Sequence, residues 1–171
     1  MSKAAAPSSV FSEQDLNRLR KLIDEDDIRG LVTRYAHYMD HGYLERMGEI
    51  FTDDIVCEYG PYGTWRGLET VISKFQHVKD DLGGKPFAAM HAGGSHWIEF
   101  IDPVHAVGRR QLIDFLLTRK PDENPILWLA LYDEQYRRTE LGWRISRTSL
   151  TFFWPERHQS DDFPGVFPGV S

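Results

Sequence analysis

The sequence has a single cysteine, no long apolar run and no segment that resembles a secretion signal. The lone Cys57 excludes a disulfide within the chain and favours a reducing compartment. The longest mostly apolar stretches are far shorter than a membrane span. The N-terminal residues, MSKAAAPSSV, lack the apolar core of a signal peptide. We therefore expect a cytoplasmic protein with no membrane partner.

Positive charge is also scarce, because 20 Lys and Arg residues stand against 26 Asp and Glu, a formal net charge of −6. No basic stripe is present, so the sequence predicts no nucleic-acid partner. The patterns GxGxxG, GxxxxGK(S/T) and GxSxG are missing as well, and the turn Gly60-Pro61-Tyr62-Gly63 resembles none of them. Nucleotide-binding and serine-hydrolase functions therefore have no support in the sequence.

Helical periodicity dominates the first half of the chain, and everything after Pro86 is β-rich. The pair Gly93-Gly94 predicts a bulge or a close backbone approach, and Thr52-Asp53-Asp54 predicts a turn. The predicted helices cover about residues 12–23, 24–41, 43–51 and 68–81, and the predicted strands cover 55–59, 64–66, 88–101, 104–119, 126–139 and 142–154.

Helices followed by long antiparallel strands indicate an α+β fold. We expect the helices to pack on one face of a curved antiparallel sheet and to enclose a cone-shaped hydrophobic cavity. The five Trp, seven Tyr and ten Phe residues suit a β-rich core or an aromatic-lined cavity. Residues 12–154 are assigned to one domain, residues 1–11 to a flexible tail, and the Pro-containing residues 155–171 to a C-terminal extension.

Asp40 and His91 are the first candidates for chemistry. Asp40 lies in the last turn of a predicted helix that Gly42 ends, where the helix dipole disfavours a carboxylate. Taken alone, Asp40 is a solvated helix-end carboxylate or a cap for the next helix, and His91 is a structural histidine. Paired, the carboxylate would fix the imidazole tautomer and make its other nitrogen a better proton acceptor, which suits proton abstraction.

Tyrosines are the next candidates. Tyr35 precedes Asp40 by five positions, about 140° around an ideal helix, so it could flank the mouth of the same cavity. Tyr59 and Tyr62 bracket a Gly-Pro turn. Each is either a core aromatic with a satisfied hydroxyl or a phenol that donates to a substrate oxygen.

The last predicted strand carries two arginines on opposite faces, Arg144 and Arg147, because their spacing is odd. Arg147 shares its expected face with Trp143 and Ile145, so we expect Arg147 to point into the cavity, the alternative being a surface arginine. The predicted substrate-binding residues are Arg147, Tyr62, Trp65 and Trp128.

A metal site is the alternative that seven histidines raise. His37 and His41 are four positions apart, which can place two ligands on one helix face. A third ligand would have to come from Asp40, His91 or His96. No HExxH pattern or cysteine cluster supports this alternative, so we predict no metal.

The chain resembles the SnoaL-like branch of the nuclear transport factor 2-like superfamily over about residues 24–154. Within it, the chain is most similar to the branch of scytalone dehydratase, bile acid 7α-dehydratase and γ-hexachlorocyclohexane dehydrochlorinase. The residues that carry the resemblance are Ile28–Ala36, Asp40, Phe51–Asp54, Tyr62–Gly67, His91–Gly93 and Glu99–Phe100.

This resemblance implies a cone-shaped α+β fold and a His–Asp general base that works without a metal or an organic cofactor. Asp40 and His91 match the aspartate and histidine of that branch. Tyr35 and Tyr59 match tyrosines near the pocket of the bile acid enzyme, and Arg147 matches its last-strand arginine. Related chains also remove formaldehyde from lignin-derived diaryl compounds.

We therefore predict a cofactor-independent lyase that eliminates water or a one-carbon unit from a small hydrophobic, aromatic substrate. His91 abstracts a proton, Asp40 orients it, and Tyr59 or Tyr35 assists the leaving oxygen. The alternatives are a polyketide cyclase or isomerase with the same base, and a non-catalytic accessory subunit of a ring-hydroxylating dioxygenase. The resemblance favours a homotrimer over a dimer, and residues 155–171 are expected to cover the cavity or a neighbouring subunit.

Overall fold

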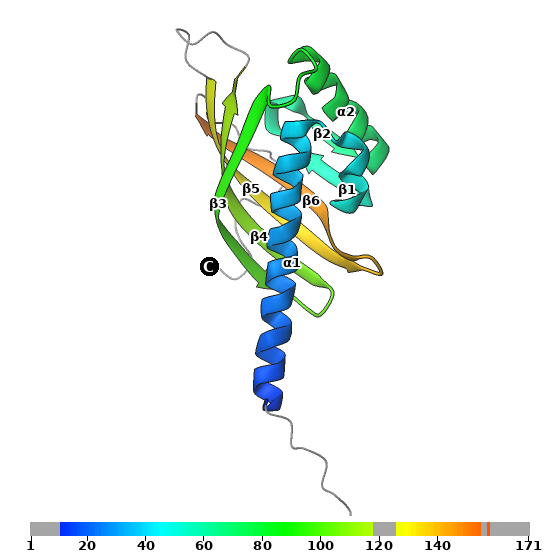
Figure 1. Ribbon diagram of the computed structural model, residues 1–171, viewed down its shortest axis with the longest axis vertical. Coiled ribbons are helices and arrows are strands. Elements are labelled where there is room, and N and C mark those ends of the chain that lie inside the picture. The colour runs from blue at the N-terminus through cyan, green and yellow to red at the C-terminus, as the bar shows by residue number, and fades with distance from the viewer. Residues whose placement is uncertain (1–10, 118–125, 155–156, 158–171) are drawn as a thin grey trace, which may run out of the picture.

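The structure, a computed structural model, describes residues 11–117, 126–154 and 157. This part of the chain forms one six-stranded sheet in the order β2-β1-β6-β5-β4-β3 (Figure 1). Neighbouring strands are antiparallel except β1 and β6, which run parallel. The elements are α1 (Glu13–His41), 3-10 helix η1 (Leu44–Glu49), β1 (Phe51–Glu58), 3-10 helix η2 (Gly60–Tyr62), β2 (Thr64–Arg66), α2 (Leu68–Asp81), β3 (Ala89–Phe100), β4 (His105–Leu116), β5 (Ile126–Thr139) and β6 (Gly142–Trp154).

Helix α1 is continuous where the sequence predicted two helices. Ser12 and Asp15 form a capping box at its start, and Gly42, with φ of 82°, ends it as predicted. The predicted break near Asp24 is wrong, because no Pro or Gly interrupts the backbone hydrogen bonds there. The Asp24 carboxylate instead accepts a hydrogen bond from the indole of Trp143 on β6.

The segment after α1 also differs from the prediction. The expected helix at 43–51 is the 3-10 helix η1, and the expected turn at 52–54 lies inside β1. Strand β1 pairs with β6 at Phe51 and resumes at Val56, so the residues between them form an irregular bulge. The polar residues predicted as a turn therefore interrupt the pairing of β1 with β6, but they form a bulge within the strand and not a turn.

The edge strand β3 contains the irregularity that its glycines predicted. Its pairing with β4 shifts register between Gly94 and Trp97, and Ser95 has a positive φ of 49°. An added Cβ at Gly93 would lie 3.4 Å from the carbonyl oxygen of Gln111. The bulge is therefore confirmed, whereas the distance at Gly93 is an ordinary van der Waals contact and nothing lies within 4 Å of a Cβ at Gly94.

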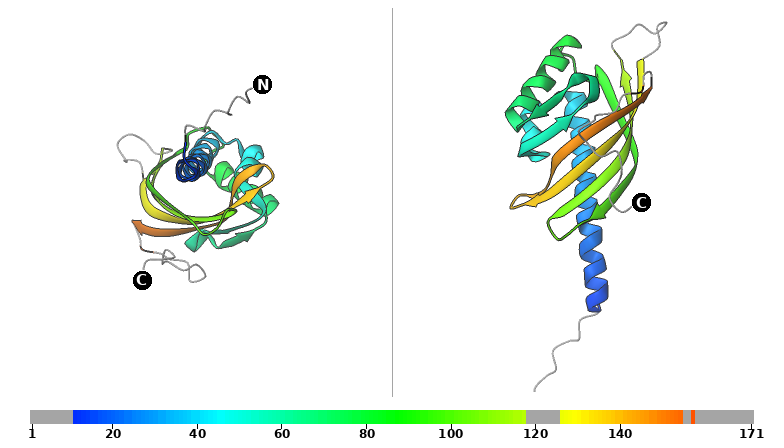
Figure 2. Two further views of the ribbon diagram at one scale, coloured as in Figure 1. Left: turned by 90° about the horizontal axis from the view of Figure 1, so that it is seen from below. Right: turned by 180° about the vertical axis from the view of Figure 1, so that it is seen from behind.

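The core lies between α1, α2 and the concave face of the sheet, which curves around α1 (Figure 2). One stripe of α1 supplies buried Ile28, Leu31, Tyr35 and Tyr38. Rings from several elements meet this stripe, among them Phe51, Tyr59, Trp65, Phe75 and Tyr132. The α+β class and the curved sheet are confirmed, and the sheet is open between β2 and β3.

Two predictions fall wholly or mostly outside the described residues. These are the flexible tail at 1–11, of which residue 11 alone is described, and the extension at 155–171 with its proposed role as a cover. Among the helices of the described part, none combines the length and the apolar character that a membrane crossing requires.

Candidate active site

Asp40 and His91 meet where the end of α1 packs against β3. The imidazole Nδ1 of His91 lies 2.5 Å from Oδ1 of Asp40. The backbone N–H of His91 also donates to both carboxylate oxygens, at 3.1 Å each. The two side chains are 14% and 6% exposed, so little water competes with this contact. The predicted contact is confirmed, and the catalytic role of the pair stays a prediction.

The local fold explains how a carboxylate is tolerated at the C-terminal end of a helix. Gly42 turns the chain into the left-handed region, and the backbone N–H of Phe87 donates to the backbone carbonyl of Asp40 at 2.6 Å. This bond and the two from His91 bring the loop before β3 against the helix end. The hydrogen-bond donors of His91 offset the unfavourable dipole and the loss of water around the Asp40 carboxylate.

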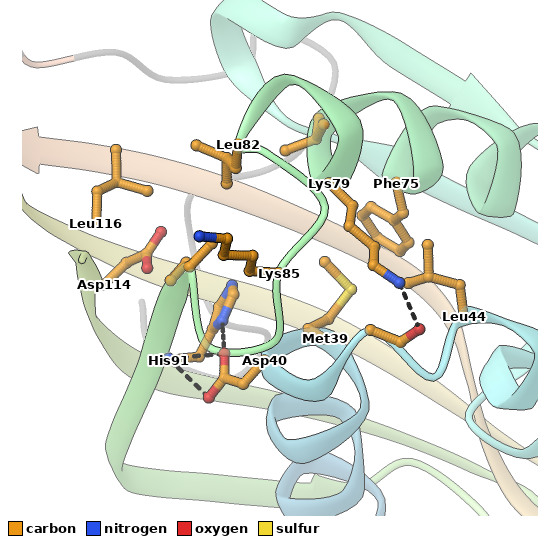
Figure 3. Close-up of a pocket in the computed structure, with 14 residues that line it drawn as sticks. Met39, Asp40, Leu44, Phe75, Lys79, Leu82, Lys85, His91, Asp114 and Leu116 are labelled. Atoms are coloured by element: carbon orange, nitrogen blue, oxygen red, sulfur yellow. Dashed lines mark hydrogen bonds and ion pairs between the residues drawn. The ribbon is translucent and has the colours of Figure 1, made fainter. Parts of the chain in front are cut away.

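Because Asp40 can only accept, the Nδ1 of His91 carries the hydrogen of this bond. The Nε2 atom is then the proton acceptor of a neutral imidazole. A cavity of about 130 Å³ lies on this side of the ring, between α1, α2, β3 and β4 (Figure 3). Most of its wall is apolar, from Met39, Leu44, Phe75, Val78, Leu82, Ala88, Ala89 and Leu116.

Asp114 is a functional candidate that the sequence analysis missed. It lies on β4 directly opposite His91 in the β3–β4 register and lines the same cavity (Figure 3). Its Oδ1 atom is buried and has no hydrogen-bond partner among the described residues. Burial raises the pKa of this carboxyl group, the nearby His91 lowers it, and Asp40 raises it further. A protonated Asp114 would be a hydrogen-bond donor in the cavity.

A signal for Asp114 was present in the sequence. Strand β4 alternates, and Leu112, Asp114 and Leu116 share its inner face. A carboxylate between two leucines at the inward positions of a strand is costly unless it has a function or a partner. Residues 104–119 were predicted as one strand, and Asp114 was not among the candidate residues.

Tyr35 and Tyr59 are buried close to the pair but do not line the cavity. The ring of Tyr35 lies 6.2 Å from that of His91, and its hydroxyl lies 3.5 Å from the hydroxyl of Tyr132. The hydroxyl of Tyr59 has no hydrogen-bond partner in the described part of the chain, and its ring stacks on Phe75 at 6.1 Å. Burial raises the pKa of Tyr35 to about 12 and that of Tyr59 well above its ordinary range.

Arg147 does not point into the cavity, so that expectation is wrong. The β5–β6 pairing shifts register beside Ser146, and this bulge reverses which residues of β6 face inward. Thr148 therefore lies on the inner face, opposite Glu134, while Arg147 lies on the outer face. There its guanidinium donates to buried Glu58 at 2.5 Å.

The other three predicted substrate-binding residues also lie away from the cavity wall. Trp65 is buried, packs edge-on against Tyr59 and donates from its indole to the backbone oxygen of Tyr62. Trp128 packs against Phe152, and the exposed Tyr62 lies 6.3 Å from the same ring. These side chains support the inner core and the turn after β1.

A buried polar network occupies the inner face of β4 and β5. Arg110 and Glu134 form an ion pair at 3.0 Å, and the hydroxyl of Tyr136 donates to Glu134 at 2.5 Å. Because that hydroxyl has one hydrogen, the His96 Nε2 atom at 3.0 Å must donate to it. Burial lowers the pKa of His96 to about 4, which keeps the ring neutral. The network is internally satisfied. None of its four residues lines the 130 Å³ cavity, but Arg110 and His96 line a groove between α1 and β3 that His91 and Asp40 also line.

The histidines of the metal alternative have other surroundings. His41 stacks against Tyr43 at 4.2 Å and meets the edge of Phe87 at 5.4 Å. His37 lines a second, more open groove between α1 and β3, which Asp40 and His91 also line. Within residues 11–117 and 126–154, no three His, Cys, Asp or Glu side chains are grouped as metal ligands.

Comparisons with known proteins agree with this architecture. Residues 20–149 match the family model of the SnoaL-like domain. No curated protein matches the chain significantly. Among solved structures, an NTF2-like protein with a cystatin-like fold from Novosphingobium aromaticivorans is 21% identical, with a TM-score of 0.73 and coverage of 86% of this chain and 94% of that chain.

Two further structures carry names that refer to elimination reactions. A candidate scytalone dehydratase from N. aromaticivorans is 14% identical, with a TM-score of 0.68 over 84% of this chain and 97% of that chain. A hexachlorocyclohexane dehydrochlorinase from Novosphingobium barchaimii is 20% identical, with a TM-score of 0.64 over 90% and 99%. At these identities the likeness concerns the fold.

Proposed function

The chain belongs to the SnoaL-like domain family, and on that premise we propose that it is a cofactor-independent lyase acting on a small aromatic substrate. The observation that carries the proposal is the 2.5 Å contact of His91 with Asp40 in the wall of a mostly apolar cavity. The names of two structural neighbours, a dehydratase and a dehydrochlorinase, support elimination as the reaction class.

In this mechanism His91 is the base. Its Nε2 lone pair takes a proton from a substrate carbon, and the electrons of the broken C–H bond form the new double bond. Asp40 holds the imidazole in the tautomer that leaves Nε2 free, and it stabilises the imidazolium that forms. The low exposure of both side chains strengthens this stabilisation, because water screens the charges less.

Asp114 is the acid of the same mechanism. The raised pKa keeps a proton on the carboxyl group at higher pH than is usual for an aspartate. That proton passes to the departing hydroxyl group, which leaves as water. His91 then holds the proton taken from carbon and Asp114 is ionised, and transfer of that proton from His91 to Asp114, directly or through water, restores the starting state. His91 and Asp114 occupy opposed positions in the β3–β4 register, so acid and base line one cavity from adjacent strands.

The cavity volume limits the substrate. An apolar cavity of about 150 Å³ is enough to hold benzene, and this one measures about 130 Å³. The part of the substrate that enters this cavity is therefore one ring or a group of similar size. A larger molecule would have to extend into solvent or displace the side chains of the wall.

The two predicted catalytic tyrosines have different surroundings. The Tyr35 hydroxyl is shared with Tyr132, whereas the Tyr59 hydroxyl has no partner among the described residues. Tyr59 is thus the tyrosine that could assist a substrate oxygen, although the ring of Phe75 lies between it and the cavity. We propose Asp114 as the principal acid and Tyr59 as a secondary donor.

The proposal is tested by incubating the purified protein with a panel of single-ring aromatic alcohols and following product mass. Loss of water or of formaldehyde supports a lyase. The variant His91→Ala should lose turnover and remain folded by circular dichroism. His105→Ala is a matched control, because His105 forms an exposed contact with Asp102 at 2.8 Å, away from the cavity.

Two outcomes would replace the lyase. A product of unchanged mass would indicate an isomerase or cyclase that uses the same base. No turnover by the protein alone, together with co-purification of a larger iron protein, would indicate an accessory subunit.

A further inference from the structure

Two lysines contribute to the otherwise apolar wall of the His91 cavity. Lys79 lies in the last turn of α2, and Lys85 lies in the loop that leads to β3. Figure 3 shows Lys85 extended across the cavity above His91, and Lys79 reaching toward the end of α1. Neither lysine forms an ion pair with a side chain in the described part of the chain.

The position of Lys79 is fixed by the end of α1. Its ammonium group donates to the backbone oxygen of Gly42 at 3.2 Å. A Cβ at position 42 would lie 2.5 Å from that nitrogen, so glycine there leaves room for the ammonium as well as permitting φ of 82°. One of the three N–H donors is used in this bond, and two are left for a ligand.

The balance of charge in the cavity favours an anion. Asp40 is already engaged by His91. Burial raises the pKa of Asp114, His91 lowers it and Asp40 raises it, with a net upward shift that favours the neutral form relative to an ordinary aspartate. Two ammonium groups therefore line the cavity with two carboxyl groups, Asp40, which already has a partner, and Asp114.

We propose that the substrate is a small anion, a one-ring compound with a carboxylate that Lys85 and Lys79 bind, and with its reacting C–H directed at His91. Calling this anion a substrate rests on the proposed lyase function. The same ammonium groups would stabilise negative charge that develops on the substrate when His91 removes the proton.

The test compares benzoate with benzamide, which has nearly the same shape and no charge, by calorimetric titration at low salt. We expect the protein to bind benzoate about tenfold more tightly, with a preference that shrinks as salt is added. The double variant K79Q/K85Q should lose the preference. K74Q, which removes an exposed lysine of α2 away from the cavity, should keep it.

Equal affinity for the two probes, no measurable binding of benzoate, or a preference that survives K79Q/K85Q would overturn the proposal. Because the titration requires no turnover, its result is independent of the lyase test. An anion preference without elimination would contradict the lyase alone, and elimination from neutral compounds without that preference would contradict this inference alone.

The N-terminal part of α1 is an exposed surface away from the cavity. Residues 16–23 are all exposed, and the two ribbon views show this part of the helix extending beyond the sheet (Figures 1 and 2). Large apolar side chains lie on it, with exposed fractions of 38% at Leu16, 40% at Leu19, 58% at Leu22 and 61% at Ile23. Leu16, Leu19 and Ile23 follow the i, i+3, i+7 spacing of a single stripe.

A helical segment as short as residues 16–23 is marginally stable in water without tertiary packing. The capping box at Ser12 supports its start, but in the described part of the chain no large apolar side chain of this segment is buried. An exposed leucine and isoleucine stripe at the end of a long helix is typical of a surface that another molecule covers.

The charges of α1 indicate which molecule covers the stripe. Arg18, Arg20 and Lys21 form a basic segment, and residues 24–27 form an acidic one. A second copy of α1 packed antiparallel would place each basic segment beside the acidic segment of its partner, whereas parallel packing in register would oppose like charges. We infer that two copies of the chain pair through this stripe in a two-fold dimer, in place of the homotrimer that the resemblance favours.

Sedimentation at micromolar concentration tests the pairing. The full chain should have twice the mass of one chain, and L19D/I23D should have the mass of one. The control L141D places the same charge at an 81% exposed leucine of the β5–β6 turn and should stay dimeric. A monomeric or trimeric wild-type chain, or a dimer that survives L19D/I23D, would refute the inference.

Discussion

Replacing Asp40 by Asn is the perturbation that separates the role of the carboxylate from that of the fold. The change removes one negative charge and preserves the shape of the side chain. Its remaining carbonyl oxygen can still accept the backbone N–H of His91, so the join between α1 and β3 is retained. What is lost is the charged acceptor 2.5 Å from Nδ1 of His91.

The expected cost follows from the strength of that contact. A hydrogen bond to a charged group contributes about 1.5–3 kcal/mol, and each ~1.4 kcal/mol of lost transition-state stabilisation lowers the rate tenfold. An imidazolium that forms during proton abstraction would lose this amount, so kcat should fall by about 10- to 150-fold. The asparagine amide can also donate to Nδ1 and so favour the imidazole tautomer with its hydrogen on Nε2. The expected decrease in kcat is therefore near the upper end of this range.

The assay is turnover of the best substrate from the mass-spectrometric panel, with thermal unfolding as the check on folding. Asp102→Asn is the matched control, because Asp102 contacts His105 at 2.8 Å in an exposed pair. If the kcat of D40N stays within threefold of the wild-type value while the protein remains folded, Asp40 does not stabilise the imidazolium of His91 as proposed.

Three further predictions concern the cavity. D114N should raise stability at pH 7 by up to about 1 kcal/mol, or ~2–4 °C in Tm. Folding raises the pKa of the Asp114 carboxyl group, so this group costs stability above its unfolded pKa of about 3.9, and the gain should disappear below that pH. D114N should lower kcat more than Y59F does, and the reverse order would make Tyr59 the principal acid. G42A should lower Tm by several degrees, since it combines a strained φ with a clash against Lys79, and an unchanged Tm would contradict that reading.

Local rules were sufficient to predict most of the architecture. The apolar stripe of α1, its end at Gly42 and the glycine bulge of β3 each follow from a residue whose physical preference is strong. The pairing of Asp40 with His91 joins positions 51 apart in sequence, and it was predicted from the resemblance together with the chemistry of the two side chains.

The predictions that failed depend on where strands slip. Arg147 was placed by simple alternation from Trp143 and Ile145, and a single bulge residue in β6 reverses that alternation. Nothing in the local sequence at Ser146 indicates the slip, because it is set by the pairing with β5. The role of Asp114 likewise depends on strand pairing, because the β3–β4 register places it opposite His91.

Turnover by the His91→Ala variant, measured beside His105→Ala on the same substrate, tests the central claim most directly. General base catalysis contributes about 10²- to 10⁴-fold to a rate. The proposed mechanism predicts a loss of that size in H91A and a rate near wild type in H105A. A folded H91A protein that eliminates at the wild-type rate would contradict the assignment of His91 as the base.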